Sequence, residues 1–380
     1  MRRLHIFLLM ILWLTSACDW FGKPHRGSGG DDEIVIGMAG PWSDLKFQGV
    51  LLKEGIMMAV EEINAKGGVL EKKIRMLEKD DEHSVNRGRL IAKDLAENNQ
   101  IVAVIGHVDS YVSMATSAIY EFSGLLMLSP TSTDPQLTRQ GFKYVFRNIP
   151  DDQEFGLKLA EYCKEQGFKR MVIYYVKNDY GRKMANSFER RVEERDVFIV
   201  DRLSYHEVTE RNFRRVLTQW KERDFDAIML IGSMPQSSTF IRQVRESGIT
   251  VPIIASNSID VPELPRLTGD AGNDIVIATT FHHKNTRAES NVFTRAFFQT
   301  YKQPPDAWAA QGYDAVKLLA GAIEQAQTTD PDKLAEALKN SEVWKGVTGP
   351  QKFDQNGDVT EKPVVFKIMN KGQFEFSREM

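Results

Sequence analysis

The stretch IVAVIGHVDSYVSMATSAIYEF, residues 101–122, indicates the fold class of the chain. Its first five residues are apolar and mostly β-branched, which is typical of a buried strand. Gly106 opens a short loop, and an amphipathic helix is expected from Ser110 onward, over residues 110–122. A buried strand followed by such a helix is the repeating unit of a parallel sheet covered by helices.

The same alternation of short apolar runs and amphipathic helices continues on both sides of this unit. One series runs from residue 34 to residue 128, and a second begins near Asp151 and reaches a strand at 253–254. The two series meet at Asn148 to Pro150, and the tail at 353–376 has the pattern of hairpin strands. Two successive series predict an α/β protein with two doubly wound parallel-sheet lobes.

The composition of the chain narrows the class of protein further. Of the 380 residues, 42% are hydrophobic and 27% are charged, which excludes wholesale disorder and predicts more than one domain. Two cysteines are too few for a disulfide scaffold. The formal net charge of -3 argues against a protein that coats nucleic acid, so no nucleic-acid partner is expected.

The first residues differ from everything that follows. Arg2 and Arg3 precede a largely apolar run at 4–14, and small residues occupy 15–17. This order predicts a secretory signal peptide, residues 1–17, because the apolar run is too short for a permanent transmembrane helix. An ordinary membrane anchor is the alternative interpretation of the same run.

Cys18 directly follows the predicted signal peptide, and its surroundings resemble a bacterial lipobox, with Thr15 where leucine is usual. Cys18 is therefore expected to carry a lipid anchor, and Asp19 resembles an inner-membrane retention signal. Residues 18–32 would form a flexible tether rich in Gly and Ser. The predicted location is the periplasm or cell envelope, at the membrane. Cys163 is expected to be a buried, inert thiol.

Hydroxyl-bearing residues follow two strands of the first series. Ligands of open parallel sheets bind beyond the carboxyl ends of the strands, where loops meet helix N-termini. Ser110 begins a predicted helix, whose free N–H groups favour an anion, and Thr131 and Thr133 lie in a Ser/Thr/Pro loop. Each residue could instead be a simple helix cap or turn residue. Taken as a set at one sheet edge, they favour a ligand site.

Several longer segments carry a family resemblance in the correct order. They are AVEEINAKGGVLEKKI (59–74), AVIGHVDSYVSMATSAIY (103–120), LSPTSTDPQLTRQGFKYVFR (128–147) and AWAAQGYDAVKLLAGAIEQA (307–326), with the pair Asp80-Asp81. From residue 34 to the C-terminus the chain resembles the type I periplasmic binding proteins of the leucine/isoleucine/valine-binding family. The resemblance implies two lobes joined by hinge strands, with residues 33–149 and 280–350 in lobe 1 and residues 150–279 and 351–380 in lobe 2.

The resemblance also implies roles for the hydroxyl residues. Members of the family hold the α-carboxylate of a small ligand with two first-lobe loops, and the matching positions here are Ser110, Thr131 and Thr133. Tyr180 resembles a second-lobe tyrosine that closes over the ligand. Trp42, together with Phe47, is expected either to form an apolar wall of the pocket or to pack in the core.

The ammonium position is where the chain departs from the leucine-binding pattern. Asn257 stands where those members have a glutamate, and Met234 stands at a nearby tyrosine position. A buried ammonium group without a carboxylate partner would cost several kcal/mol. The implied alternatives are that Asp109 or another acid supplies the charge, or that the ligand is not a standard α-amino acid.

Motifs of enzymes and metal proteins are missing from the sequence. There is no G-x-G-x-x-G, no P-loop lysine and no G-x-S-x-G motif, so no catalytic residue and no cofactor is predicted. His282 and His283 are adjacent, and in a strand they would point to opposite faces, so no metal site is predicted. The leading hypothesis is an extracytoplasmic, lipid-anchored component of an ABC importer that binds an amino acid or a related small carboxylate and delivers it to a membrane permease. The alternative is an envelope lipoprotein of the same fold that regulates a cell-wall enzyme or a sensor.

Overall fold

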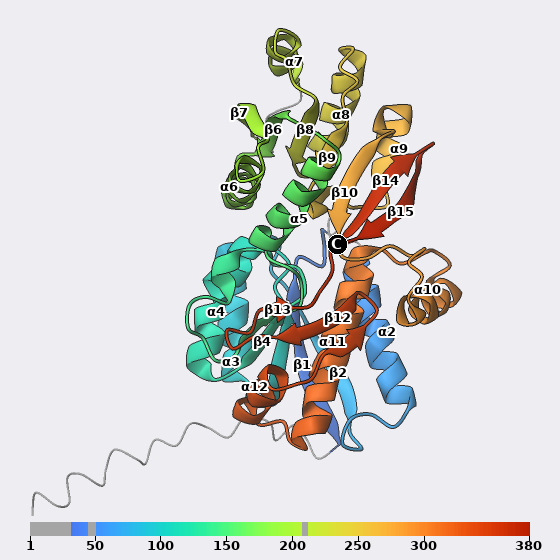
Figure 1. Ribbon diagram of the computed structural model, residues 1–380. Helices are drawn as coiled ribbons and strands as arrows, with labels where there is room; N and C mark the ends of the chain where they lie inside the picture. The colour runs from blue at the N-terminus through green and yellow to red at the C-terminus, as the bar shows by residue number, and fades with distance from the viewer. Residues whose placement is uncertain (1–31, 45–50, 207–211) are drawn as a thin grey trace, which may run out of the picture.

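The computed structural model describes residues 32–44, 51–206 and 212–380, which form two lobes stacked along the long axis of the molecule (Figure 1). The predicted signal peptide, Cys18, Phe47 and the tether up to residue 31 lie outside the described residues. Within the described ranges, no helix combines the length and the apolar character needed to cross a bilayer.

The first lobe is built on a five-stranded parallel sheet with the order β2-β1-β3-β4-β5. The strand predicted at 101–105 is its central strand and runs over Ile101–Gly106. Every residue of this strand is buried, as the uninterrupted apolar run predicts. The sheet comprises β1 (Glu33–Gly40), β2 (Lys73–Asp80), β3 (Ile101–Gly106), β4 (Leu126–Ser129) and β5 (Val145–Arg147).

Helices cover both faces of this sheet. They are α2 (Leu52–Ala65), α3 (Val85–Glu97), α4 (Ser110–Ser123), α11 (Ala307–Ala326) and α12 (Pro331–Lys339), with α10 (Ala288–Tyr301) beside them and a short 3-10 turn, η1 (Pro135–Leu137). One apolar core joins the sheet to α2, α11 and α12, and the other joins it to α3 and α4. The contact between α2 and α11 is close enough that a Cβ on Gly55 would lie 1.9 Å from the carbonyl oxygen of Ala309.

The second lobe contains a seven-stranded sheet with the order β15-β14-β10-β9-β8-β6-β7. The strands from β6 to β10 are parallel, whereas β14 and β15 are antiparallel to their neighbours. The strands are β6 (Arg170–Val176), β7 (Phe198–Tyr205), β8 (Ala227–Ile231), β9 (Ile253–Ala255), β10 (Ile275–Thr279), β14 (Val365–Asn370) and β15 (Gln373–Glu379). The helices are α5 (Asp152–Glu165), α6 (Asp179–Glu193), α7 (Arg214–Lys221), α8 (Gln236–Glu246) and α9 (Leu264–Thr268), with the 3-10 turns η2 (Asn257–Ile259) and η3 (Gly269–Gly272).

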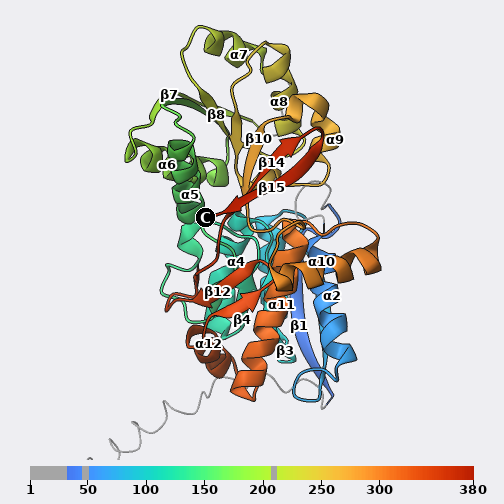
Figure 2. The same cartoon turned by 45° about the vertical axis from the view of Figure 1, so that its right-hand side comes forward.

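The tail divides between the lobes differently from the expectation that residues 351–380 all join lobe 2. A small antiparallel sheet of β11 (Trp344–Gly346), β12 (Gly349–Phe353) and β13 (Val359–Thr360) lies beside the first lobe (Figures 1 and 2). Phe353 packs into the first-lobe core, and the buried guanidinium of Arg147 binds the carboxylate of Asp358 at 2.6 Å. Hairpin periodicity predicts a strand but not the sheet it joins, and these long-range contacts decide the assignment.

Three segments cross between the lobes, after β5, after β10 and before β14. The third crossing carries Lys362, whose ammonium is buried and donates hydrogen bonds to the carbonyl oxygen of Asn148 and to Oε1 of Gln311, each at 2.5 Å. Burial lowers the pKa of Lys362 to about 7. The lysine therefore ties the first and third crossings to helix α11.

Candidate functional site

A cavity of about 550 Å³ lies between the lobes, at the carboxyl ends of the strands of both sheets. This is where the strand-end rule placed the candidate loops. Seven of the eight predicted ligand-binding residues line it: Asp109, Ser110, Thr131, Thr133, Tyr180, Met234 and Asn257. The structure therefore brings residues from five separate strand-end loops to one cleft.

The first-lobe hydroxyls are held in a fixed arrangement. Ser110 is the first residue of α4, and its Oγ accepts a hydrogen bond from the backbone N–H of Thr133 at 3.2 Å. The hydroxyl of Thr131 donates to the carbonyl oxygen of Val108 at 2.7 Å. Because a helix N-terminus presents unpaired N–H groups and a positive dipole end, this corner of the cleft favours an anion.

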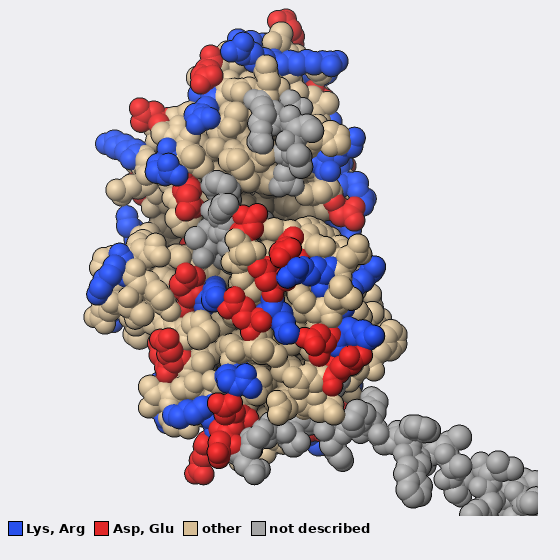
Figure 3. All heavy atoms as spheres, turned by 180° about the vertical axis from the view of Figure 1, so that it is seen from behind, with Lys and Arg blue, Asp and Glu red and all other residues tan. Residues whose placement is uncertain are grey.

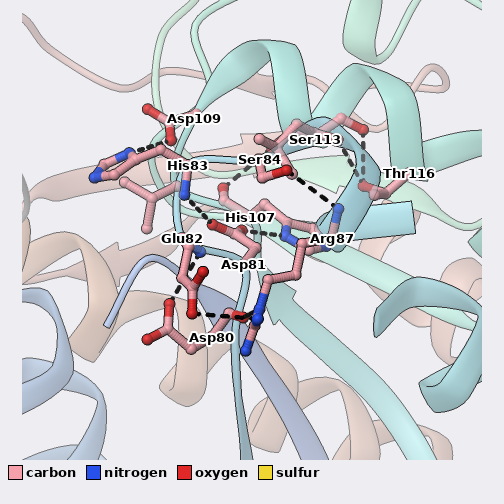
Figure 4. Close-up of polar contacts among 12 residues, drawn as sticks. Asp80, Asp81, Glu82, His83, Ser84, Arg87, His107, Asp109, Ser113 and Thr116 are labelled. Atoms are coloured by element: carbon pink, nitrogen blue, oxygen red, sulfur yellow. Dashed lines mark hydrogen bonds and ion pairs between the residues drawn. The ribbon is translucent and has the colours of Figure 1, made fainter. Parts of the chain in front are cut away.

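A buried polar network supports these loops from behind. Asp81, His107 and Tyr120 are fully buried, and His107 Nδ1 lies 2.6 Å from Asp81 Oδ2 while Nε2 lies 3.0 Å from the Tyr120 hydroxyl. The carbonyl oxygen of His107 accepts hydrogen bonds from Ser113, Ser129 and Thr131. Figure 4 shows Asp81 reaching His107 below the loop that carries Asp109. Such a satisfied network fixes the loop backbone that faces the ligand.

The second lobe presents a tyrosine to the opposite wall. The Tyr180 hydroxyl donates to Ser256 Oγ at 3.0 Å and lies 3.5 Å from Asn257 Oδ1. Burial raises the pKa of Tyr180 well above its ordinary value, so this group remains a neutral hydrogen-bond donor. Asn257 itself is neutral and buried, so the residue at the expected ammonium position brings no charge.

Of the two expectations for Trp42, pocket wall or core packing, the structure shows packing against the core. Trp42 donates its Nε1–H to the carbonyl oxygen of Met38 at 3.2 Å and packs against the first-lobe core, and it is not among the described residues that line the cavity. Trp308, at the start of α11, lines the cavity instead, and its Nε1–H donates across the lobes to the carbonyl oxygen of Asp260 at 3.1 Å. Trp308 lies inside the segment 307–326 that carries the family resemblance, so a sequence signal for it existed.

Asp109 has a partner that the sequence did not reveal. His83, in the loop after β2, lies with Nδ1 2.7 Å from Asp109 Oδ2, and both residues line the cavity (Figure 4). The hydrogen bond to Asp109 raises the pKa of His83 to about 9. Asp109 is thus already neutralised by an imidazolium, which removes it as the simple counter-charge for a ligand ammonium.

A second carboxyl group, Asp152, sits directly behind the cleft. It begins α5, is 2% exposed, and its backbone N–H donates to the carbonyl oxygen of Thr133 at 2.8 Å. Among the described residues neither carboxyl oxygen makes a hydrogen bond of good geometry, and the Thr133 hydroxyl is the neighbouring group that acts to lower the Asp152 pKa. Burial raises the pKa of Asp152 to about 8, and the neighbouring Asp151 and Asp134 add to the rise. In sequence, this residue looked like an ordinary helix start, and nothing distinguished it.

An ion pair also joins the lobes across the mouth of the cleft. Lys183 on α6 binds the carboxylate of Asp134, which follows the Thr131 and Thr133 loop. The Asp134 side chain is 8% exposed, so the pair is shielded from solvent on the acid side. Elsewhere in the described ranges, no group of His, Cys, Asp and Glu is placed to hold a metal ion.

Known proteins of similar sequence and structure share this architecture. Residues 33–373 match a family described as "Periplasmic binding protein". The leucine-, isoleucine-, valine-, threonine- and alanine-binding protein of Pseudomonas aeruginosa is 26% identical over 330 residues, covering 86% of this chain and 87% of that protein.

Two solved structures resemble the chain over nearly its whole described length. An ABC transporter substrate-binding protein from Desulfitobacterium hafniense, in complex with Leu, is 39% identical with a TM-score of 0.82, covering 91% of this chain and 100% of that one. A leucine-binding protein from Thermotoga maritima is 29% identical with a TM-score of 0.84, covering 91% and 98%. Since the family match spans most of the sequence, the chain belongs to the periplasmic binding protein family, as the leucine/isoleucine/valine-binding motifs predicted.

Proposed function

We propose that the protein is the extracytoplasmic substrate-binding component of an ABC importer and that it binds an α-amino acid between its lobes. The observation that carries the proposal is an anion-favouring corner at Ser110 and Thr133, which line the cavity, with the buried carboxyl of Asp152 directly behind Thr133. A zwitterionic ligand matches such a pair of neighbouring sites. No step of chemistry is required, because the ligand acts by holding the lobes together.

The ligand carboxylate would accept hydrogen bonds from Ser110, Thr133 and the first N–H groups of α4. Its ammonium group would reach toward Asp152 past Thr133, whose carbonyl oxygen accepts the backbone N–H of Asp152 at 2.8 Å. This assignment explains how the site could bind an ammonium group without a glutamate at position 257. The negative charge would come from Asp152, at the start of α5, and not from the second-lobe loop that carries Asn257. Asp152, and not Asp109, would then be the carboxylate that pairs with the ammonium group of a standard amino acid.

The cellular setting of this proposal follows from the N-terminal sequence. Residues 1–17 would direct export, Cys18 would carry the lipid anchor, and the tether would leave the two lobes free to meet a permease in the membrane. The chemically mixed surface suits a diffusing carrier: the face seen in Figure 3 has acidic and basic side chains interspersed over both lobes. The family is one of substrate-binding transport proteins and not of enzymes.

A calorimetric and thermal-shift screen of the mature protein with the standard L-amino acids tests the proposal. A true ligand at a hundredfold excess over Kd should add about 2.7 kcal/mol to the free energy of unfolding. Ser110→Ala should then weaken binding by about tenfold or more, because it removes a hydrogen bond to a charged group.

Ser123→Ala is the matched control, since Ser123 lies at the other end of the same helix, away from the cavity lining, and donates to the carbonyl oxygen of Tyr120. Unchanged affinity in Ser110→Ala would contradict the site. If no amino acid binds while an envelope enzyme or sensor does, the regulatory alternative replaces transport. The open cavity of about 550 Å³ disfavours that alternative, which a filled cleft would have supported.

A further inference from the structure

Three charged side chains line the cleft among the described residues, and all three belong to the first lobe. They are Asp44, His83 and Asp109; no lysine or arginine is among the lining residues. His83 is the one cation, so its pairing decides how much negative charge the wall offers to a ligand side chain. Asp109 immediately precedes Ser110 in the sequence. Its carboxylate is therefore a neighbour of the corner proposed to hold the ligand carboxylate.

The imidazole of His83 is held in place by contacts on several sides. Its backbone N–H donates to Asp81 Oδ1 at 3.1 Å, and its carbonyl oxygen accepts from the Tyr111 hydroxyl at 3.1 Å. The ring then reaches Asp109 Oδ2 at 2.7 Å, and the Asp109 side chain is only 10% exposed. Figure 4 shows the ring and the carboxylate pointing toward each other above the Asp81 loop.

The acids that face His83 keep it charged at neutral pH. The hydrogen bond with Asp109 is the largest cause of its raised pKa, and a backbone hydrogen bond with Asp44 and the charge of Asp81 act in the same direction. Asp81 is itself engaged by His107, so Asp109 is the carboxylate whose charge His83 chiefly neutralises. With His83 protonated the three lining charges sum to -1, and without it they sum to -2, so the histidine decides how much negative charge the wall offers.

We propose that His83 sets the charge preference of the cleft: by pairing with Asp109 it withholds that carboxylate from the ligand, so that amino acids with uncharged side chains are accepted and basic ones are disfavoured. The inference rests on the proposed amino-acid function and adds the class of side chain. An added ammonium or guanidinium would meet an imidazolium, and the carboxylate of Asp109 beside it is already engaged, whereas an uncharged side chain has no such conflict.

Replacing His83 with a neutral residue tests the inference directly. In His83→Gln, Asp109 is released, and the affinity for L-lysine or L-arginine should rise by about tenfold or more relative to the uncharged amino acid that the wild type binds best. The quantity compared is the ratio of the two affinities, because a freed Asp109 beside the carboxylate corner acts on the uncharged ligand as well. In the double variant His83→Gln/Asp109→Asn the gain for basic ligands should disappear, because the released carboxylate is gone. Isothermal titration calorimetry at pH 7.5 measures all of these affinities.

A folded His83→Gln variant that binds the uncharged ligand but gains nothing for lysine or arginine would overturn the inference, as would a gain that persists in the double variant. If His83→Gln does not fold, Asp109→Asn provides the opposite test: an unpaired His83, assayed at pH 6, should improve binding of L-glutamate relative to the uncharged ligand. No improvement there also overturns it. A wild-type protein that binds no amino acid at all would instead contradict the proposed function, so the two failures are distinguishable.

Discussion

Two carboxyl groups beside the cleft, Asp109 and Asp152, differ in what surrounds them. Asp109 lies on the cavity wall and is paired with His83, so its charge is compensated before any ligand arrives. Asp152 is buried, has no cationic side chain bonded to it among the described residues, and burial raises its pKa to about 8. Burying a carboxyl group without a charged partner costs free energy in the empty protein. Such a cost is expected of a group whose role is to bind a cationic partner.

The first prediction concerns stability and binding in Asp152→Asn. The folded protein holds a proton on Asp152 that the unfolded chain releases above about pH 4, so this residue lowers the free energy of unfolding as pH rises toward 8. The variant should therefore raise the Tm of the empty protein at pH 8 by a few degrees, about 1 kcal/mol, while abolishing amino-acid binding. Differential scanning calorimetry with and without ligand measures both effects. A variant that binds normally would exclude Asp152 as the ammonium partner.

The second prediction concerns proton linkage in the wild type. A ligand ammonium stabilises the ionised form of Asp152 and lowers its pKa, so binding at pH 7 should release about one proton. The Kd should accordingly fall as pH rises from 6 to 8. Titrations in buffers of different ionisation enthalpy count the released protons, and Asp152→Asn is the control in which the release should vanish. Buffer-independent enthalpies in the wild type would contradict the assignment.

At the scale of the elements, the spacing of apolar residues was enough to predict most strands and helices. The strand expected at 101–105 and the helix at 110–122 are observed at Ile101–Gly106 and Ser110–Ser123, because local apolar spacing and the glycine before the loop determine both. The assignment of β12 and β13 to a lobe could not be predicted, because it depends on Phe353 and Asp358 meeting residues some 200 positions away. The roles of His83 and Asp152 could not be predicted for a related reason. Their proximity to the cleft arises only when loops that are distant in sequence meet in the fold.

The third prediction tests the contact between α2 and α11. Gly55→Ala would place a methyl group 1.9 Å from the carbonyl oxygen of Ala309, so the helices must separate, and we expect a loss of about 2–4 kcal/mol in the free energy of unfolding. Gly321→Ala is the matched control in α11, because a Cβ there meets nothing within 4 Å and should stabilise the helix by up to about 1 kcal/mol. Urea denaturation of the two variants should show opposite signs. Equal stability of both would contradict the close packing.

At the scale of the whole molecule, the lobes are joined by polar contacts as well as by the three crossings. The ion pair between Lys183 and Asp134 and the hydrogen bond from Trp308 to Asp260 both bridge the cleft. Such contacts favour the closed arrangement independently of ligand, and they set how much of the closing free energy the ligand must supply.

The fourth prediction is that Lys183→Met shifts the empty protein toward an open arrangement. Losing the bridging pair should raise the radius of gyration measured by X-ray scattering without ligand and weaken binding by about threefold to tenfold. Lys158→Met is the matched control, because among the described residues Lys158 pairs with acids on its own helix, Glu154 and Glu161. If both variants scatter alike and bind alike, the Lys183 pair does not hold the lobes together.

The late position of Phe353 and α11 also governs the order in which the protein can fold during synthesis. The core of the first lobe joins strands made early to Trp308, Leu319 and Phe353, so its apolar face stays uncovered until nearly the whole chain has left the ribosome. The core of each lobe includes residues from the end of the chain, Phe353 in the first and Phe366 in the second, so an N-terminal fragment lacks part of each core. That delay suits a polypeptide that must thread through a narrow translocation channel before it folds, and it makes the arrangement of segments itself an aid to secretion.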